Sequence, residues 1–151
     1  MEDHTCSLVT DVEALVPNSW RKRLHRVLVG VYFQVIALRH GERLPDSGAV
    51  FLGGHWIGAL DGLVYNSVLP ASVYMMSRQL TCNPVGRVFF CGIEVIREKD
   101  RATFPDSRKD NREAMKQCHK VLESGTNLFV FPEGTSSSAH GVYRCRVVLP
   151  I

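Results

Sequence analysis

A histidine and an aspartate stand close together in the sequence, at positions 55 and 61. A carboxylate that accepts a hydrogen bond from one imidazole nitrogen fixes the ring tautomer. The other nitrogen can then take a proton from a substrate hydroxyl. Five residues separate His55 from Asp61, which puts the two side chains about 120° apart on a regular helix. The pair can meet only if the segment begins as a turn, which Gly53, Gly54 and Gly58 would permit.

A second group of polar residues follows an apolar run near the end of the chain, where residues 131–137 read Phe-Pro-Glu-Gly-Thr-Ser-Ser. Gly134 would let the backbone approach a ligand closely, and the Thr135 and Ser136 hydroxyls could bind phosphate or hydroxyl oxygens. Taken alone, this segment has an alternative interpretation as a surface turn with a solvated Glu133.

The elements that position these residues can be predicted from apolar runs and turn signals. Strands are expected at residues 49–52, at 72–76, within 88–96 and at 128–131, and the first of them should be buried. Helices are expected at 61–69 and 107–124, the second with one apolar face and a glycine stop at position 125. Alternating strands and helices predict an α/β fold: a mixed, parallel-rich sheet flanked by helices, with sites at strand ends.

A further helix is predicted to begin near Ser19 with a basic segment. That segment carries four basic residues: Arg21, Lys22, Arg23 and Arg26. The apolar stretch 27–38 that follows would cover about 18 Å as a helix, short of the ~30 Å hydrocarbon core of a bilayer. Such a helix either lies in a membrane interface, with its arginines toward headgroups, or packs on the core with a solvated basic end.

Composition and missing motifs exclude several classes of protein. The chain has 151 residues, of which 45% are hydrophobic and 22% charged, and a net charge of +3, as in an ordinary single globular unit. Its five cysteines are scattered without metal-ligand spacing and fit a reducing compartment. Neither the Gly-x-Ser-x-Gly motif of hydrolases nor a Gly-x-x-x-x-Gly-Lys phosphate loop is present. The basic cluster adjoins an apolar run, which favours a lipid partner over nucleic acid.

The order of the motifs along the chain resembles a known family. His55 with Asp61, a glycine-to-arginine segment that ends at Arg97, and Phe-Pro-Glu-Gly-Thr at 131–135 together resemble the glycerolipid acyltransferases, which include the lysophosphatidic acid and lysophospholipid acyltransferases. The resemblance runs from about residue 49 to residue 138. The pentapeptide behind an apolar strand is its most specific element.

The resemblance implies a role for each candidate residue. His55 would be the catalytic general base, and Asp61 the acid that orients it. Arg97 would hold the phosphate of the acceptor. The other substrate-binding residues expected from the resemblance are Glu133, Gly134, Thr135 and Ser136.

The implied reaction is transfer of a fatty acyl group from an acyl thioester to the hydroxyl of a lysophospholipid such as 1-acylglycerol-3-phosphate, in phospholipid biosynthesis or remodelling. The donor would be acyl-CoA or an acyl carrier protein, and no metal or other cofactor would be needed. The expected partners are the acceptor, the donor and a membrane lipid surface, and the expected location is peripheral, on the cytoplasmic face. Residues 1–40 would form a leader and a membrane-interface helix, and residues 41–151 the acyltransferase domain.

The chain departs from the family pattern in three ways. Five residues, rather than four, lie between His55 and Asp61, and Ser136 replaces an arginine that often follows the pentapeptide. The chain also stops before the last strands expected of the family, so that the domain would be incomplete. These departures leave one alternative open, which is an inactive, truncated remnant that still binds membranes.

Overall fold

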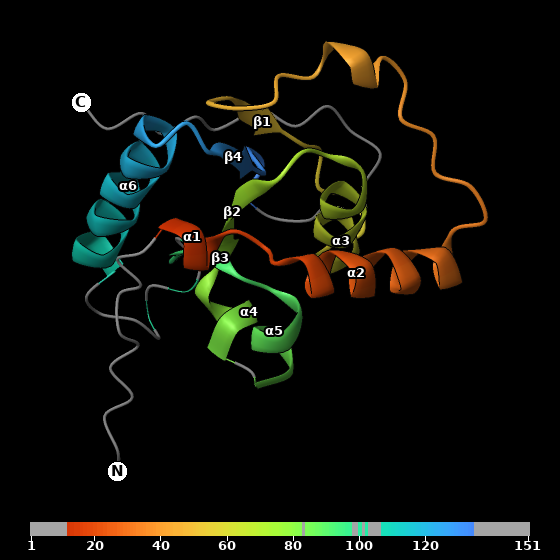
Figure 1. The fold of residues 1–151 in the computed structure, drawn as a ribbon. Coiled ribbons are helices and arrows are strands. Elements are labelled where there is room, and N and C mark those ends of the chain that lie inside the picture. The colour runs from red at the N-terminus through yellow and green to blue at the C-terminus, as the bar shows by residue number, and fades with distance from the viewer. Residues whose placement is uncertain (1–11, 83, 98–99, 101, 103–106, 135–151) are drawn as a thin grey trace.

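The computed structural model describes residues 12–82, 84–97, 100, 102 and 107–134 (Figure 1). Its described strands form one parallel sheet in the order β1-β4-β2-β3. They are β1 (Val50–Leu52), β2 (Ser72–Ser77), β3 (Gly92–Val95) and β4 (Asn127–Val130). The expected α/β fold with a parallel-rich sheet flanked by helices is therefore confirmed, and the strands lie close to the positions that the apolar runs predicted.

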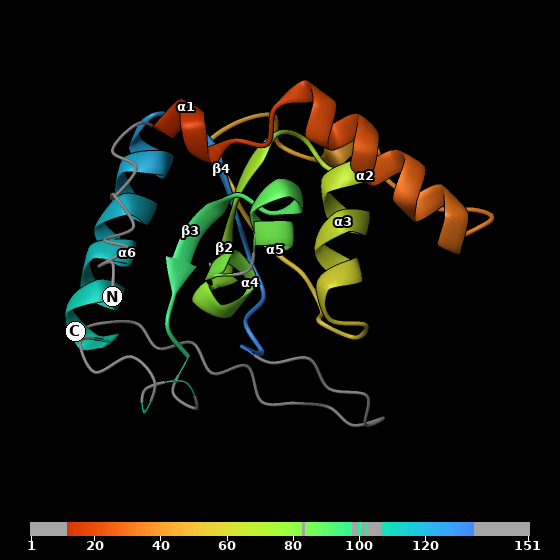
Figure 2. The ribbon, with the colours of Figure 1, turned by 90° about the horizontal axis from the view of Figure 1, so that it is seen from below.

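Two layers of helices cover the sheet (Figure 2). One face carries α1 (Val12–Leu15) and α6 (Ser107–Glu123). The opposite side carries α2 (Ser19–Tyr32), α3 (Ala59–Val68), α4 (Arg78–Cys82) and α5 (Pro84–Phe89), and a short 3-10 turn, Gly41–Arg43, precedes β1. The short helices α4 and α5 were not predicted, because five or six residues are too few to show a helical hydrophobic period.

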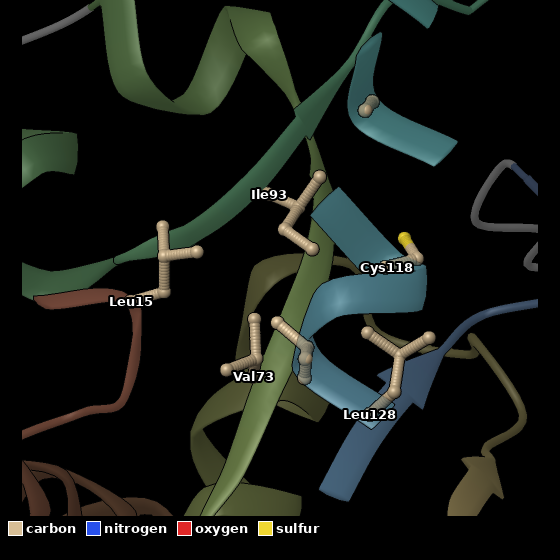
Figure 3. Close-up of a cluster of buried hydrophobic side chains, with 7 residues drawn as sticks. Leu15, Val73, Ile93, Cys118 and Leu128 are labelled. Atoms are coloured by element: carbon tan, nitrogen blue, oxygen red, sulfur yellow. The ribbon is translucent and has the colours of Figure 1, made fainter. Parts of the chain in front are cut away.

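The alternation of side chains along β2 supplies both layers of the core. Val73 points into the cluster under α6, together with Leu15, Ile93, Cys118 and Leu128 (Figure 3). Its neighbour on β2, Tyr74, packs on the other face of the sheet, in the cluster that includes Leu69, Met76 and Phe129.

Helix α6 matches its prediction closely. Ala114, Cys118 and Val121 recur at helical spacing and are all buried, so the apolar face of the sequence pattern is the face that packs on the sheet. Gly125 follows the helix with a φ of 78°, a left-handed conformation that favours glycine. The amide of Thr126 then donates to the carbonyl of Val121 at 3.1 Å, which closes the end of the helix.

The prediction of a buried first strand is wrong. Strand β1 pairs with β4 and stands at the edge of the described sheet. As a consequence Val50 and Leu52 are exposed, with 49% and 66% of their surface accessible. An apolar run shows that a strand can form, but the position of the strand in the sheet decides whether both of its faces are covered.

Helix α2 lies across the C-terminal ends of α3 and α5 (Figure 2). Three of its four basic side chains donate to backbone carbonyl oxygens at those ends, where the helix dipole is negative and the carbonyls lack partners. The pairs are Arg21 Nε with Val88 O at 3.0 Å, Lys22 Nζ with Leu69 O at 3.1 Å, and Arg26 Nε with Ser67 O at 3.4 Å. Arg23 lies on the exposed side. The basic segment therefore joins α2 to the domain rather than standing wholly in solvent.

Two further observations concern α2. His25 and Val29 are its buried residues, on the side of the helix that packs against α3. In the described part of the chain, no helix is both long enough and apolar enough to cross a bilayer.

Candidate active site

The segment that follows β1 stays close to β4 and thereby places His55. The amide of Gly53 donates to the carbonyl of Val130 at 3.1 Å. A Cβ on Gly53 would lie 2.4 Å from the Phe129 ring, so this close approach requires glycine. Two residues later, the His55 ring packs on the ring of Phe131, with 4.4 Å between the ring centroids.

The structure brings His55 and Asp61 together in spite of the longer spacing. Gly58, at the N-cap of α3, has φ 73° and ψ −129°, a conformation that only glycine adopts readily. This turn absorbs the additional residue, and Asp61 enters the first turn of α3 with its side chain facing back toward the histidine. His55 Nδ1 lies 3.3 Å from Asp61 Oδ2.

The geometry of the pair is close but not fully aligned. The His55–Asp61 contact has ion-pair distance, yet Nδ1 does not reach hydrogen-bond geometry toward any described residue. The amide of Ile57 donates to the same Asp61 oxygen at 2.8 Å, which fixes the carboxylate. Catalytic hydrogen bonds in proteins without substrate are often poorly aligned and tighten when substrate binds. The arrangement is thus suited to a base whose orienting acid is already held in place.

The pentapeptide motif lies directly beside the histidine. Glu133 Oε2 accepts a hydrogen bond from the backbone amide of His55 at 3.4 Å, and Gly134 has a φ of 65°. The Phe131 ring packs against the imidazole at a tilt of 36°. Residues 132–134 do form a turn, as the alternative interpretation expected, but Glu133 is not fully solvated, because its side chain is partly buried against the His55 segment. Thr135 and Ser136 lie outside the described residues.

A cavity of about 430 Å³ begins at this site and extends between α3 and the α4–α5 pair. His55, Gly134 and Arg97 line it near the carboxyl ends of the strands. Most of the remaining wall is apolar and includes Met76 and Phe90. The structure therefore places Arg97, the third motif residue expected at the site, on the same cavity as the histidine and the pentapeptide.

A second histidine, His25 of α2, lines the far end of the cavity. Its Nε2 donates to the carbonyl of Phe89 at 2.8 Å, and Asn66 Nδ2 donates to its Nδ1 at 2.6 Å. Only 3% of the surface of His25 is accessible. Burial is the main reason why the pKa of His25 is lowered. The hydrogen bond to the Phe89 carbonyl opposes this effect in part, and the positive charge of Arg21 lowers the pKa by a smaller amount. Sequence reasoning missed this residue, because its partners are 41 and 64 positions away.

Tyr65 contacts the segment that carries His55 and lies near two carboxylates. Burial is the main reason why the pKa of the neighbouring Tyr65 is raised, and the carboxylates of Asp61 and Glu133 raise it further. The Tyr65 hydroxyl donates to the carbonyl of Gly54 at 3.5 Å. The carboxylate of Asp61 therefore faces the imidazole of His55, and that of Glu133 lies at the backbone amide of the same residue.

The comparisons with known proteins agree with this arrangement. A family model described as Acyltransferase matches residues 36–147. This range contains the His55–Asp61 pair, Arg97 and the pentapeptide. No curated protein and no solved structure gives a significant match.

Proposed function

The chain belongs to the acyltransferase family, and from this membership we propose that it transfers a fatty acyl group from an acyl thioester to the hydroxyl of a lysophospholipid. The donor is acyl-CoA or an acyl carrier protein. The acceptor is a lysolipid of the 1-acylglycerol-3-phosphate type, so that the reaction serves phospholipid biosynthesis or remodelling. The observation that carries the proposal is the contact of 3.3 Å between His55 and Asp61 at one end of an apolar cavity.

In the proposed reaction, His55 is the general base. Its Nδ1 faces the carboxylate of Asp61, which leaves Nε2 to take the proton of the acceptor hydroxyl. The hydroxyl oxygen attacks the thioester carbonyl carbon, and the carbon–sulfur bond then breaks. The departing thiolate receives the proton from the imidazolium, and the products are an ester and a free thiol. General-base assistance of this kind contributes roughly 10²–10⁴-fold to the rate.

The cavity supports a fatty acyl chain as the transferred group. Ligand pockets with mainly apolar walls and a few polar groups at one end favour substrates of the same character. Here His55 and Arg97 supply polar groups near one end, and side chains such as Met76 and Phe90 supply apolar walls. Each buried methylene of an acyl chain would contribute about 0.8 kcal/mol to binding.

We extend the proposal to a membrane lipid surface as the place where the chain meets its acceptor. The outward side of α2 carries Trp20, Val27 and Val31, which are spaced so that they share one helical face. Val27 and Val31 expose 65% and 78% of their surface, and Val35 beyond the helix exposes 82%. An apolar stripe of this kind, with the exposed Arg23 beside it, supports contact with an anionic lipid surface.

Vesicle flotation tests the lipid surface. Val27→Glu combined with Val31→Glu should abolish co-flotation with vesicles that contain phosphatidylserine. Gln34→Glu, which adds the same negative charge per site at an exposed polar position, is the matched control and should bind. If the double variant floats as well as the unmodified chain, α2 is not the lipid contact.

Acyl transfer from a radiolabelled acyl thioester to a panel of lysolipids tests the reaction itself. The unmodified chain should form the ester, and His55→Ala should lose that activity while retaining its fold. Binding to anionic vesicles without any transfer would support the alternative of an inactive remnant. Transfer that survives in His55→Ala would overturn the mechanism.

A further inference from the structure

Arg97 is part of a closed ring of three side chains. Its Nε donates to Asp100 Oδ2 at 2.7 Å, and its Nη2 donates to Gln79 Oε1 at 2.7 Å. Gln79 Nε2 in turn donates to Asp100 Oδ1 at 3.0 Å, so each of the three side chains bonds to the other two. The backbone amide of Asp100 also donates to the carbonyl of Arg97 at 2.9 Å, which ties the two residues together a second time.

The residues of the ring come from two segments that lie side by side in the fold. Gln79 lies in the first turn of α4, directly after β2, whereas Arg97 and Asp100 follow β3. Strands β2 and β3 are paired in parallel register, so their carboxyl ends meet at one edge of the sheet. Gln79 and Arg97 both line the cavity that contains His55. The ring therefore forms part of the wall of the candidate active site.

The residues of the ring differ in how many of their hydrogen-bonding groups are already used. Both oxygens of Asp100 are used, and only 6% of the surface of this residue is accessible. Arg97 uses two of its five N–H groups in the ring. The other three, on Nη1 and Nη2, have no partner among the residues that the structure describes. A guanidinium with two fixed contacts and free N–H groups is pre-organised for an oxyanion such as phosphate.

We propose that Gln79 and Asp100 are positioning residues, which hold the guanidinium of Arg97 in place for the phosphate of the acceptor. This inference rests on the proposed function and deepens it, because it assigns acceptor recognition to a ring rather than to one arginine. Without these hydrogen bonds, the Arg97 side chain would lose its conformational entropy when the phosphate binds. The affinity for the phosphate would therefore fall. The chemistry at His55 would continue once the acceptor is bound.

The test compares two acceptors that differ by the phosphate, 1-acylglycerol-3-phosphate and monoacylglycerol. Gln79→Ala and Asp100→Asn should each raise KM for the phosphate-bearing acceptor about tenfold, with kcat changed less than about threefold and KM for the donor unchanged. KM for monoacylglycerol should not rise. Gln79 is exposed, so its variant should fold even if removal of the Asp100 charge disturbs the core.

A matched control is available at the same edge of the sheet. Asp110 of α6 also accepts a hydrogen bond from an arginine, Arg78, at 3.0 Å, but it makes no contact with the ring. Asp110→Asn should leave KM for both acceptors as in the unmodified chain. Equal KM values for 1-acylglycerol-3-phosphate in Gln79→Ala, Asp100→Asn and Asp110→Asn would overturn the inference, and so would a loss of kcat that is the same for both acceptors.

The role of the ring can be tested independently of the proposed acyl transfer. Binding of 1-acylglycerol-3-phosphate to the His55→Ala chain, measured by calorimetry, requires no turnover. Adding Gln79→Ala to that chain should weaken the binding about tenfold. If the unmodified chain transfers no acyl group, the proposed function fails, while this binding comparison still supports or overturns the role of the ring.

Discussion

Two histidines line one cavity, and their environments differ in the way that separates a reactive group from a structural one. At the far end, His25 has a hydrogen-bond partner on each ring nitrogen, at 2.8 and 2.6 Å, and only 3% of its surface is accessible. At the end beside the pentapeptide, the side chain of His55 is 20% accessible and lies 3.3 Å from Asp61 without a well-formed hydrogen bond. Both ring nitrogens of His25 are occupied by hydrogen bonds within the fold, whereas Nδ1 of His55 has no well-formed hydrogen bond among the described residues.

The difference follows from the groups that each ring faces. His25 faces an amide and a backbone carbonyl, which are neutral, and the nearby cation Arg21 further disfavours a charge on the ring. His55 faces the carboxylate of Asp61 and has the carboxylate of Glu133 beside its backbone amide. Burial among neutral partners therefore makes a histidine part of the packing, whereas partial burial beside carboxylates makes it a candidate base.

The largest effect is expected at His55. His55→Gln removes the base but keeps a polar side chain, and kcat for acyl transfer should fall roughly 10²–10⁴-fold, with little change in the melting temperature. His119→Gln, on the exposed side of α6, is the matched control and should keep full activity. A His55→Gln chain that turns over at the normal rate would show that the two histidines do not differ in the proposed way.

A smaller loss of activity is expected at Asp61. Asp61→Asn can still accept the hydrogen bond from the Ile57 amide, so the start of α3 should keep its shape. The neutral amide no longer stabilises the imidazolium, and kcat should fall about 10- to 100-fold. The pH profile of kcat/KM provides a second measurement, since the loss should be present across the profile. A rate that is unchanged across the pH range would contradict the role of the carboxylate.

His25 should matter for stability. His25→Leu leaves the Asn66 amide and the Phe89 carbonyl without their partner, and the free energy of unfolding should fall by about 1–3 kcal/mol. Urea denaturation measures this change, with His119→Leu as the exposed control. An equal effect of the two substitutions would mean that the buried network contributes nothing.

The lowered pKa of His25 predicts how stability changes with pH. In the folded chain this pKa lies below the unfolded value of about 6.5, so on acidification the unfolded chain binds the proton first. Stability is therefore retained above pH ~6.5 and falls below it, by up to about 1.4 kcal/mol per pH unit from this group. In His25→Gln this part of the acid sensitivity should disappear, as thermal denaturation between pH 5 and 8 would reveal. A steeper acid dependence in the variant would reverse the assignment.

The smallest effect is expected between the two histidines, at Gly62 of α3. This residue lines the cavity, and a Cβ there would meet only the Phe90 ring, at 4.0 Å. Gly62→Ala should raise the free energy of unfolding by about 0.5–1 kcal/mol, because alanine is the better helix former. Gly62→Leu should extend into the cavity and lower activity with long acyl chains more than with short ones. Equal activity of Gly62→Leu with all chain lengths would show that the acyl chain lies elsewhere.

Much of the fold was accessible from the sequence. Apolar runs predicted the four described strands, and the 3.6-residue period of Ala114, Cys118 and Val121 predicted α6 with its buried face. These signals are local, since they depend only on neighbouring residues along one element. The burial of β1 was predicted wrongly for the same reason, because the number of neighbours of a strand is not a local property.

The residues of the candidate site also fall into two groups, those that the sequence identified and those that it could not. The motif residues His55, Asp61, Arg97 and Glu133 could be selected from their types and order. In the structure His55 and Arg97 line one cavity, and Asp61 and Glu133 contact the His55 residue. His25 and Asp100 could not be selected. Each of them acquires its significance from partners on other elements, such as Asn66 for His25 and Gln79 for Asp100.

The sequence by itself determined which elements form and which side chains carry reactive groups, because propensity, periodicity and chemical type belong to each segment. Only the tertiary structure decided whether those groups meet. The turn at Gly58 lets Asp61, six positions after His55, reach the imidazole ring. Basic side chains of α2, which could otherwise have faced lipid, donate hydrogen bonds to carbonyl oxygens at the ends of other helices. Contacts of this kind join atoms that are far apart in the chain. They form only when the helices and the sheet have packed together.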